Sequence, residues 1–462
     1  MPEALTLTTT SIPSPPKPAS LWKESEVDRL SSSLGEPASL LNLRLQAFGR
    51  TKVTPWPTAL DESWRRNNPR RIGRDKFGLW TKEAADAVTP SRASSDSFDA
   101  ISTSRISLRN CELVRSDILD DHSISGLSAG SLEQGYNSCN AKLLEQLALD
   151  VPDDKDSPAV SLYHLAFSQG GSYCIVPENW SSPDPLVIHH QLNHSGKALF
   201  PLNIVHVGRR SEATIILEQD DQSDLDAWLG VSTRISLAEG AKLNLIAINR
   251  AGKPVNFYEH LSVSLKKDAN FSLTWFDNTA GWTVMRREAS LAGKGAEARL
   301  KGAYVGADDT LYDLRTLQDH TAPSTFSDLM FKAVNFHSAK SVYQGLIKVS
   351  PDAINANAYQ LNRNLLMSPE ARADSIPKLE ILVDEVKCTH GASVGKPDAN
   401  ALFYLRSRGI SEKDAIRLIV EGFLGEAGNL ISNPQILEYW REAVINRFEA
   451  VYENAESTPA GI

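Results

Sequence analysis

The run Ser211-Glu212-Ala213-Thr214-Ile215 combines a polar turn, an alanine and the start of an apolar stretch, and this pattern returns three times along the chain. The later copies are Glu239-Gly240-Ala241-Lys242-Leu243, Lys267-Asp268-Ala269-Asn270-Phe271 and Lys294-Gly295-Ala296-Glu297-Ala298. Their alanines, at positions 213, 241, 269 and 296, lie 28, 28 and 27 residues apart. A fixed period of this size predicts stacked coils, because one coil cannot bury its apolar face without neighbours.

The segments around these repeats look like strands. Between residues 158 and 395, short β-branched runs bounded by turn residues recur, for example at 185–188, 202–207 and 214–217. Because no helical pattern separates them, a parallel β-helix (a β-solenoid) over residues 158–395 fits better than alternating strand–helix units. A β-sandwich is the alternative, since its strands also recur roughly every 8–12 residues. The regular alanine spacing favours the β-helix.

Helical patterns precede this core. Residues 21–157 are predicted to form an N-terminal helical region, with helical patterns over 21–50 and 131–149 and a loop-like stretch at 50–80. Residues 1–20, which are rich in Pro, Ser and Thr, are expected to be a disordered leader.

Residues 396–462 are predicted to form a C-terminal helical region, so the fold is mainly β with an α-helical region on each side of the core. Ser411 and the pair Asn433-Pro434 have the character of helix starts. An apolar stripe at helical spacing follows Ser411 and consists of Ile416, Ile419, Val420, Phe423 and Leu424. Packing on the end of the solenoid is the commoner use of such a stripe, and docking of another chain is the alternative.

Composition limits the possible functions. The 462-residue chain is 41% apolar and 23% charged, which suits an ordinary protein of two or three domains with a sizeable core. A formal net charge of −9 argues against a generally basic surface for nucleic acid or anionic lipid. The basic cluster over residues 64–71 is interpreted as a solvated loop with arginine–carboxylate pairs.

Several features together predict a protein of the reducing cytoplasm. No run approaches the roughly 18 consecutive apolar residues of a membrane-spanning helix. The N-terminus lacks the basic and apolar segments of a secretory signal. Four cysteines, Cys111, Cys139, Cys174 and Cys388, are scattered without a C-x-x-C pair, which is neither a disulfide framework nor a self-sufficient metal site.

The stretch LEILVDEVKCTHGASVGKPDANALFYLRSRG at residues 379–409 carries the candidate site. On an extended strand, Cys388 and His390 lie at i and i+2 on one face. A thiol and an imidazole can hold a thiophilic metal, but a tetrahedral site needs about four ligands, so this pair would be half of a site. From spacing alone, a lone C-x-H is more often a buried thiol beside a satisfied histidine. The other histidines of strand-like segments have no ligand set around them and are expected to be core or surface residues: His189, His190, His194, His206 and His260.

Two other motifs of this region are weaker. Residues 391–397 imitate a phosphate loop, but three rather than four residues separate the glycines and Pro397 follows the lysine, so nucleotide binding is rejected. Asp384 and Glu385 could act as acid and base on a carbohydrate-active β-helix enzyme. Adjacent residues of a strand face opposite ways, however, which argues against a shared active site.

The run at 379–409 closely resembles the SufB/SufD family, whose members are scaffold subunits of the SUF machinery for iron–sulfur cluster assembly. The sequence Lys387-Cys388-Thr389-His390-Gly391-Ala392 is similar to the D-type subunits, and the further cysteine motifs expected of a B-type subunit are not found. The family fold, a parallel β-helix flanked by helical regions, agrees with the prediction from the residues. Other segments also fit the family: Tyr343-Gln344-Gly345, residues 362–368 (NRNLLMS), Gly35-Glu36-Pro37 and Trp64-Arg65-Arg66.

The resemblance implies a scaffold that is not itself an enzyme and has no catalytic residues. It implies pairing with a SufB-like paralogue through the β-helix and docking of a SufC-like ABC-type ATPase on the C-terminal helical region. His390 and Cys388 match D-type positions near the interface of the two paralogues. Iron or a nascent iron–sulfur cluster would be bound there transiently, with the missing ligands from the partner, and no nucleotide would bind this chain. Cys388 would be either essential or auxiliary to this metal contact. The candidate ATPase-docking region is the apolar stripe together with Tyr404 and Arg408.

Two other classes of function stay open from the residues. One is a carbohydrate-active β-helix enzyme, which needs a cleft lined by convergent carboxylates and aromatic side chains. The other is a self-assembling structural solenoid without a ligand. Replacing His390 by alanine separates both from a scaffold, because only the scaffold would lose cluster delivery. Iron entry, cluster assembly and cluster transfer are all compatible with these residues.

Overall fold

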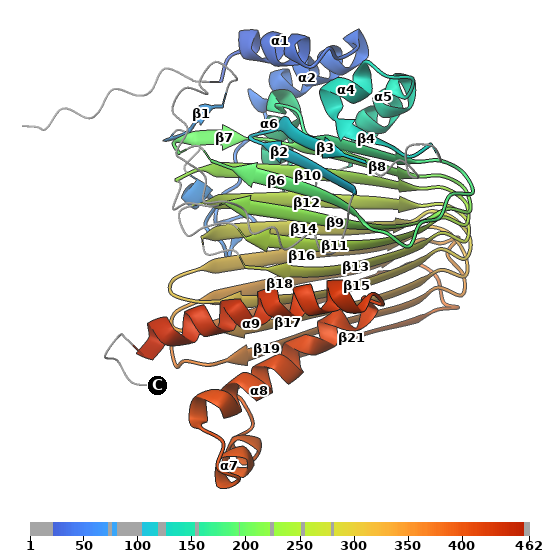
Figure 1. The fold of residues 1–462 in the computed structure, drawn as a ribbon. Coiled ribbons are helices and arrows are strands. Elements are labelled where there is room, and N and C mark those ends of the chain that lie inside the picture. The colour runs from blue at the N-terminus through green and yellow to red at the C-terminus, as the bar shows by residue number, and fades with distance from the viewer. Residues whose placement is uncertain are drawn as a thin grey trace, which may run out of the picture.

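A stack of β-coils with helices at one end and along one face makes up the computed structural model (Figure 1). The structure describes residues 22–72, 76–80, 104–118, 126–152, 157–193, 195–221, 226–250, 255–278 and 281–456. The leader predicted at residues 1–20 and His194 lie outside these residues.

Two sheets form the walls of the coil stack. Sheet A has 11 strands: β1 (Gly78–Leu79), β4 (Ser128–Ser131), β5 (Ser172–Val176), β7 (Lys197–Leu199), β8 (Leu202–Val207), β10 (Trp228–Leu237), β12 (Asn256–Leu265), β14 (Trp282–Leu291), β16 (Leu311–His320), β18 (Lys340–Val349) and β20 (Arg372–Ile381). Sheet B has 10 strands: β2 (Ser104–Arg109), β3 (Glu112–Asp117), β6 (Leu186–Leu192), β9 (Glu212–Asp221), β11 (Lys242–Arg250), β13 (Asn270–Asp277), β15 (Glu297–Gly306), β17 (Phe326–Asn335), β19 (Asn357–Leu366) and β21 (Lys387–Gly395).

From β8 to β21 the chain alternates between the two sheets, and each strand from β10 onward pairs in parallel with the strand two places earlier. This topology confirms the predicted parallel β-helix and excludes the β-sandwich, whose sheets are antiparallel. The predicted alignment of the alanine repeat is correct for Ala241, Ala269 and Ala296, which occupy equivalent positions in successive coils, and wrong for Ala213. Lys242 pairs with Glu212, so Ala241 is equivalent to Ser211, and Ala213 lies beside Leu243. The coils differ in length by a few residues, which a search for one fixed period misses.

In-register pairing stacks like residues into columns inside the lumen. Leu245, Leu273, Leu300 and Leu329 pair in succession on sheet B, and each is at most 2% exposed. Full burial of one leucine stabilises a fold by about 1.5–3 kcal/mol. Such columns, repeated across both sheets, hold the coils together.

The N-terminal helical region covers the first coil (Figure 1). The patterns at 21–50 and 131–149 each contain two helices, and the described residues 52–72 and 76–80 form an irregular stretch with two 3₁₀ turns and β1. Trp64, expected in a solvated loop, is buried and stacks on Trp282 with ring centroids 6.0 Å apart, whereas Arg66 keeps a carboxylate partner in Asp374 at 3.8 Å. The elements are α1 (Glu24–Ser33), α2 (Ala38–Thr51), η1 (Glu62–Trp64), η2 (Pro69–Ile72), α4 (Leu132–Tyr136), α5 (Ala141–Leu149) and α6 (Pro158–Phe167).

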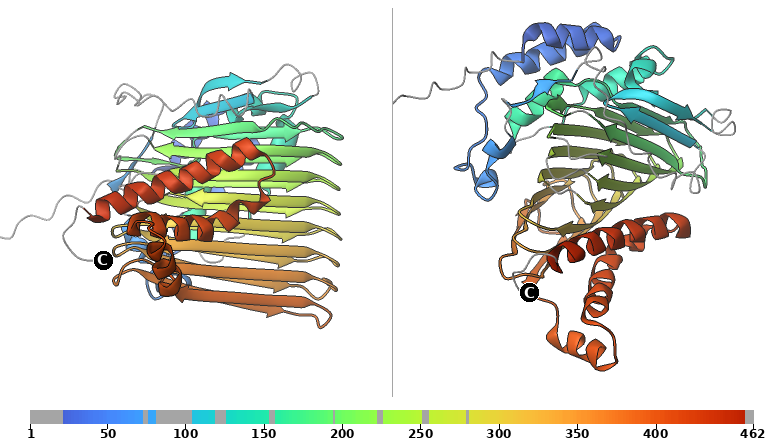
Figure 2. Two further views of the ribbon diagram at one scale, coloured as in Figure 1. Left: turned by 60° about the horizontal axis from the view of Figure 1, so that its bottom comes forward. Right: turned by 60° about the vertical axis from the view of Figure 1, so that its left-hand side comes forward.

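The C-terminal helical region consists of α7 (Ala399–Ser407), α8 (Glu412–Gly425), η6 (Glu426–Leu430) and α9 (Pro434–Glu456). Ser411 caps α8 by accepting a hydrogen bond from the Asp414 N–H at 3.1 Å, and Asn433 caps α9 in the same way through Gln435, both at the predicted positions. Figure 2 shows α8 and α9 lying across the outer face of sheet B, whereas α7 extends beyond the last coil. None of the helices among the described residues is long and apolar enough to cross a membrane.

Candidate functional site at the open end of the β-helix

The last coil of the β-helix ends in two strands with free edges. Among the strands that the structure describes, β20 pairs only with β18 and β21 only with β19, so each leaves one row of backbone N–H and C=O groups without a neighbouring described strand. We call these two strands the rim. A free strand edge is a ready template for pairing with another chain.

Within the described part of the chain, no further coil covers the inward side chains of the rim. Leu379 and Ile381 stand above the buried Ile347 and Val349 in the same columns, yet they are 38% and 39% exposed. Val394 on β21 is 45% exposed. Solenoids normally end in a capping repeat with a polar outer face. Here the mouth of the lumen is apolar and open, as expected of a surface that another protein covers.

Cys388 and His390 lie on this rim and point into the mouth. Cys388 pairs with Ala358 and His390 with Gln360, and both of those residues are buried on the lumen side of β19. Paired residues of parallel strands face the same way, so the thiol and the imidazole share the lumen face. The structure therefore brings the two predicted ligands together on one strand at the open end.

The two side chains differ in their surroundings. Cys388 is half-buried against an apolar cluster that includes Ile347, Val349 and Ala358, whereas His390 is exposed. Burial raises the pKa of the Cys388 thiol, and a hydrogen bond with the Ala358 backbone lowers it in part. The thiol therefore carries its proton at neutral pH, and a nearby cation or metal would be needed to favour the thiolate.

These two residues supply only half of a metal site. Over the described ranges, no group of three or more His, Cys, Asp or Glu side chains could hold a metal ion. Asp384 and Glu385 are both exposed and lie in the turn between β20 and β21 rather than on a strand. Gly391 to Gly395 continue β21 and do not form a loop before a helix, so the phosphate-loop interpretation stays rejected.

The predicted docking residues divide into two groups. Ile416, Val420 and Leu424 are buried against the outer face of sheet B, so most of the stripe packs within the chain; Ile419 and Phe423 are half-buried. Lys332 of β17 fixes this packing by donating to the Phe423 carbonyl at 2.8 Å and by pairing with Glu426. A partner can reach the three buried residues only if α8 leaves the sheet.

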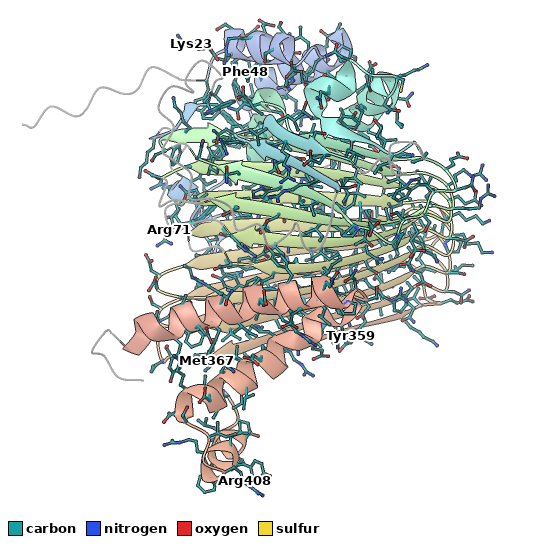
Figure 3. The ribbon with its side chains drawn as sticks, viewed as in Figure 1. Lys23, Phe48, Arg71, Tyr359, Met367 and Arg408 are labelled. Atoms are coloured by element: carbon teal, nitrogen blue, oxygen red, sulfur yellow. The ribbon has the colours of Figure 1, made fainter. Side chains whose placement is uncertain are left out.

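The second group lies on α7 and is exposed. Tyr404 is 57% exposed, and the Arg408 guanidinium lies 5.1 Å from the centre of its ring. Phe403, which the sequence analysis did not select, is 74% exposed. Figure 3 shows Arg408 at the far tip of this projecting helix. None of the described α7 residues is buried.

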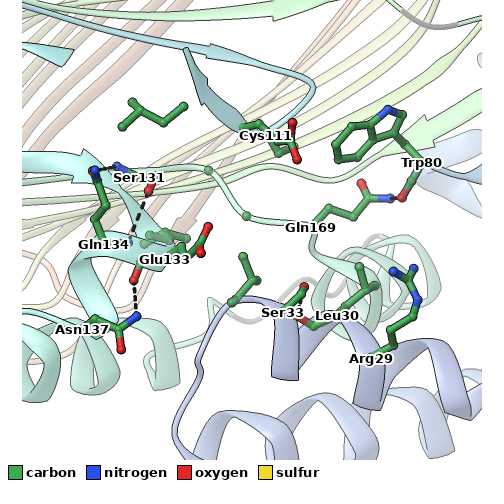
Figure 4. Close-up of a pocket in the computed structure, with 16 residues that line it drawn as sticks. Arg29, Leu30, Ser33, Trp80, Cys111, Ser131, Glu133, Gln134, Asn137 and Gln169 are labelled. Carbon is green, nitrogen blue, oxygen red and sulfur yellow. Dashed lines mark hydrogen bonds between the residues drawn. The ribbon is translucent and has the colours of Figure 1, made fainter. Parts of the chain in front are cut away.

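The other cysteines and histidines that the structure describes lie away from the rim. Burial raises the pKa of Cys174 to about 12 and lowers that of His189 to about 3. Cys111 lies beside a cavity of about 530 Å³ under the N-terminal helices (Figure 4). Burial raises the pKa of this thiol strongly. His190 and His260 are also buried, in line with the expectation of core residues.

Comparison with known proteins finds similarity to iron–sulfur cluster assembly proteins. The family model described as "SUF system FeS cluster assembly, SufBD core domain" matches residues 190–423. The iron–sulfur cluster assembly protein SufD of Escherichia coli (strain K12) is 30% identical over 280 residues, which cover 59% of this chain and 63% of that protein. SufD of Bacillus subtilis (strain 168) is 24% identical over 85% of this chain and 90% of its own length. An iron–sulfur cluster assembly SufBD family protein of Mycobacterium leprae is 38% identical over 35% of this chain and 43% of its own length. The alignments to the Escherichia coli and Mycobacterium leprae proteins thus span less than two thirds of either relative.

Proposed function

The chain belongs to the SufBD family of the SUF system for iron–sulfur cluster assembly, and from this premise we propose that it is a SufD-like scaffold subunit that pairs with a SufB-like paralogue. The observation that carries the proposal is the placement of His390 and Cys388 on a free strand edge at an uncovered apolar mouth. A partner that adds its own strand edge would cover the mouth and bring further ligands to the two donors.

In this proposal the iron or nascent cluster is cargo shared between two chains. His390 offers a borderline nitrogen ligand, and Cys388 a thiolate once a positive charge is near. The chain itself has no catalytic residue and binds no nucleotide, and it acts in the cytoplasm. ATP hydrolysis belongs to a SufC-like ATPase that docks on α7 through Phe403, Tyr404 and Arg408.

The decisive experiment compares two substitutions on β21. The full chain is produced together with its B-type paralogue and the ATPase, and the complex is purified and assayed for bound iron and for cluster delivery. His390→Ala is expected to leave the complex intact and to remove most of the delivery. Thr389→Ala, an exposed neighbour on the opposite face of the strand, is the matched control and is expected to behave as the wild type. Wild-type delivery by His390→Ala would refute the metal role.

The ATPase-docking part has its own test. Tyr404→Ala combined with Arg408→Ala removes an aromatic and a cationic anchor from α7, and interface anchors of these types typically contribute about 2 kcal/mol or more each. Co-purification of the ATPase is expected to fall strongly while pairing with the paralogue persists. Leu418→Ala, at an exposed position of α8 that is 44% accessible, is the control. Equal ATPase recovery in both variants would contradict docking at α7.

A further inference from the structure

The last closed coil of the lumen differs chemically from the coils before it. On β19 the successive lumen-facing residues Gln360, Asn362 and Asn364 are amides, at most 3% exposed. The residues paired with them on β17 are Leu329, Phe331 and Ala333. A layer of buried amides therefore separates the apolar lumen from the rim.

Two of these amides have definite partners. The Asn362 Nδ2 group donates to the Phe331 carbonyl at 3.2 Å, and the Asn364 Nδ2 group donates to Asn362 Oδ1 at 2.8 Å. Gln360 is held less firmly, because its Nε2 group donates to the Gly345 carbonyl at 3.5 Å, the outer limit of a hydrogen bond. Gln360 Oε1 is buried and accepts no hydrogen bond from any residue that the structure describes.

Gly345 makes room for the Gln360 side chain. A Cβ atom at position 345 would lie 2.6 Å from Gln360 Oε1 and 2.3 Å from the hydroxyl oxygen of Tyr343. The Tyr343 hydroxyl is bonded to Thr316 at 3.0 Å and so is fixed. The Tyr343-Gln344-Gly345 segment, for which the proposed function gives no role, thus shapes the layer directly beneath the rim.

Gln360 lies directly beneath His390 in the coil stack. The two residues pair in register on neighbouring strands, and their side chains face the same way. The backbones of such strands lie about 4.8 Å apart. His390 makes no hydrogen bond or ion pair with the rest of the described chain. An unpaired buried acceptor and an imidazole N–H are chemically complementary. They make no hydrogen bond with each other in this structure, so joining them requires the Gln360 side chain to turn toward His390.

We propose that Gln360 is the positioning residue of His390: its Oε1 atom accepts a hydrogen bond from one ring nitrogen and so directs the other ring nitrogen into the mouth. This inference rests on the proposed function, in which His390 meets iron at the interface. A metal-binding histidine normally has its second ring nitrogen held by such an acceptor, which fixes the tautomer and the ring orientation. A neutral amide does this without placing a charge in the lumen.

The first test reads the tautomer of His390 without any metal. Full-length chain labelled with ¹⁵N-histidine is studied at about pH 8.5, where an ordinary histidine is neutral, and His390→Asn assigns the resonance. In the wild type the two ring nitrogens are expected to show the separated shifts of a single tautomer. Gln360→Leu is expected to move them toward averaged values, and Gln360→Glu, which keeps an acceptor, to preserve the wild-type pattern.

Gln318→Leu is the matched control. Gln318 is also a fully buried glutamine of the lumen whose Oε1 lacks a partner among the described residues. It stands under Ile347 rather than under the histidine, so the His390 resonances should not change. Averaged shifts in the wild type, or an unchanged pattern in folded Gln360→Leu, would overturn the inference. If Gln360→Leu does not fold, the wild-type tautomer and Gln360→Glu decide the outcome.

The second test uses ferrous iron alone with the purified complex of this chain and its paralogue. Gln360→Leu is expected to weaken iron retention roughly tenfold, the lower end of the effect of losing such an acceptor, and Gln318→Leu to leave it unchanged. If His390→Ala retains iron like the wild type, the proposed function itself fails. If His390→Ala loses iron while Gln360→Leu keeps both the tautomer and the iron, only the positioning role is overturned.

Discussion

At the scale of single residues, Cys388 and His390 share one face of β21 but meet different environments. Their positions along the strand explain the difference. Cys388 packs against the apolar cluster of the last coil, whereas His390 lies at the open mouth of the lumen. The i, i+2 spacing predicted the common face from sequence alone. It could not predict exposure, which depends on whether another coil lies above.

The raised pKa of Cys388 predicts slow thiol chemistry in the isolated chain. At pH 7.5 the thiol is protonated, so alkylation by iodoacetamide is expected to be slower than for a free cysteine and to accelerate as the pH rises. Peptide mass spectrometry over a pH series measures the rate. Fast labelling at neutral pH would show that the thiolate already forms without a metal or partner.

Glu218 gives a second prediction at this scale. Burial raises its pKa from 4.5 to about 7, and the carboxylate accepts from the Tyr439 hydroxyl of α9 at 2.8 Å and pairs with Arg250 at 3.2 Å. Between these pH values the folded chain holds a proton that the unfolded chain releases. This stabilising contribution is therefore complete below about pH 4.5 and is lost as the pH rises through 7, by up to roughly 3 kcal/mol.

Melting temperatures at pH 5 and pH 8 test that sign. Glu218→Gln keeps an acceptor for Tyr439 but carries no charge, so its Tm should fall less between the two pH values than the wild-type Tm. Glu212→Gln, on the exposed surface of the same strand β9, is the control and should follow the wild type. A wild-type slope in Glu218→Gln would mean that this carboxyl does not titrate in the range.

At the scale of elements, the free edge of β21 is the feature that matters most. The Lys387 N–H bonds to the Ala356 carbonyl of the coil beneath, and in a parallel pair alternate residues bond to opposite sides. Odd-numbered residues of β21 thus bond to β19, and the N–H groups of Cys388, His390 and Ala392 face the free edge.

Ala392→Pro should therefore block pairing without unfolding the coil. It removes one N–H from the free edge, where proline is tolerated, and none from the bonds to β19. The variant is expected to melt within a few degrees of the wild type but to lose the paralogue in co-purification. Ser393→Pro removes an N–H on the β19 side and is expected to destabilise the last coil itself. Normal pairing by Ala392→Pro would contradict edge-to-edge association.

The sequence predicted some elements well and others poorly, for physical reasons. Helix caps are local, and Ser411 and Asn433 were found at their places. The apolar stripe of α8 was equally clear, but its partner was not, because amphipathic spacing does not say which surface buries it. Gln360 and Phe403 were missed for the same reason: lumen position and surface exposure follow from strand register and from the projection of α7.

At the scale of the whole molecule, the two ends of the β-helix differ in how they are covered. Helices close the first coil, whereas the last coil exposes Leu379, Ile381 and Val394 around a half-complete ligand pair. The fold class followed from strand pattern and repeat, and the family resemblance predicted a partner, which we propose covers the open end.

Hydrogen exchange at β21 is the most direct test of this account. Amides of residues 388–394 are measured in the chain alone and in complex with its B-type paralogue. The account predicts that exchange at Cys388, His390 and Ala392 slows at least tenfold in the complex, while β13 in the middle of the stack does not change. Unchanged exchange along β21 in a complex that does form would contradict it, because the second chain would then bind elsewhere.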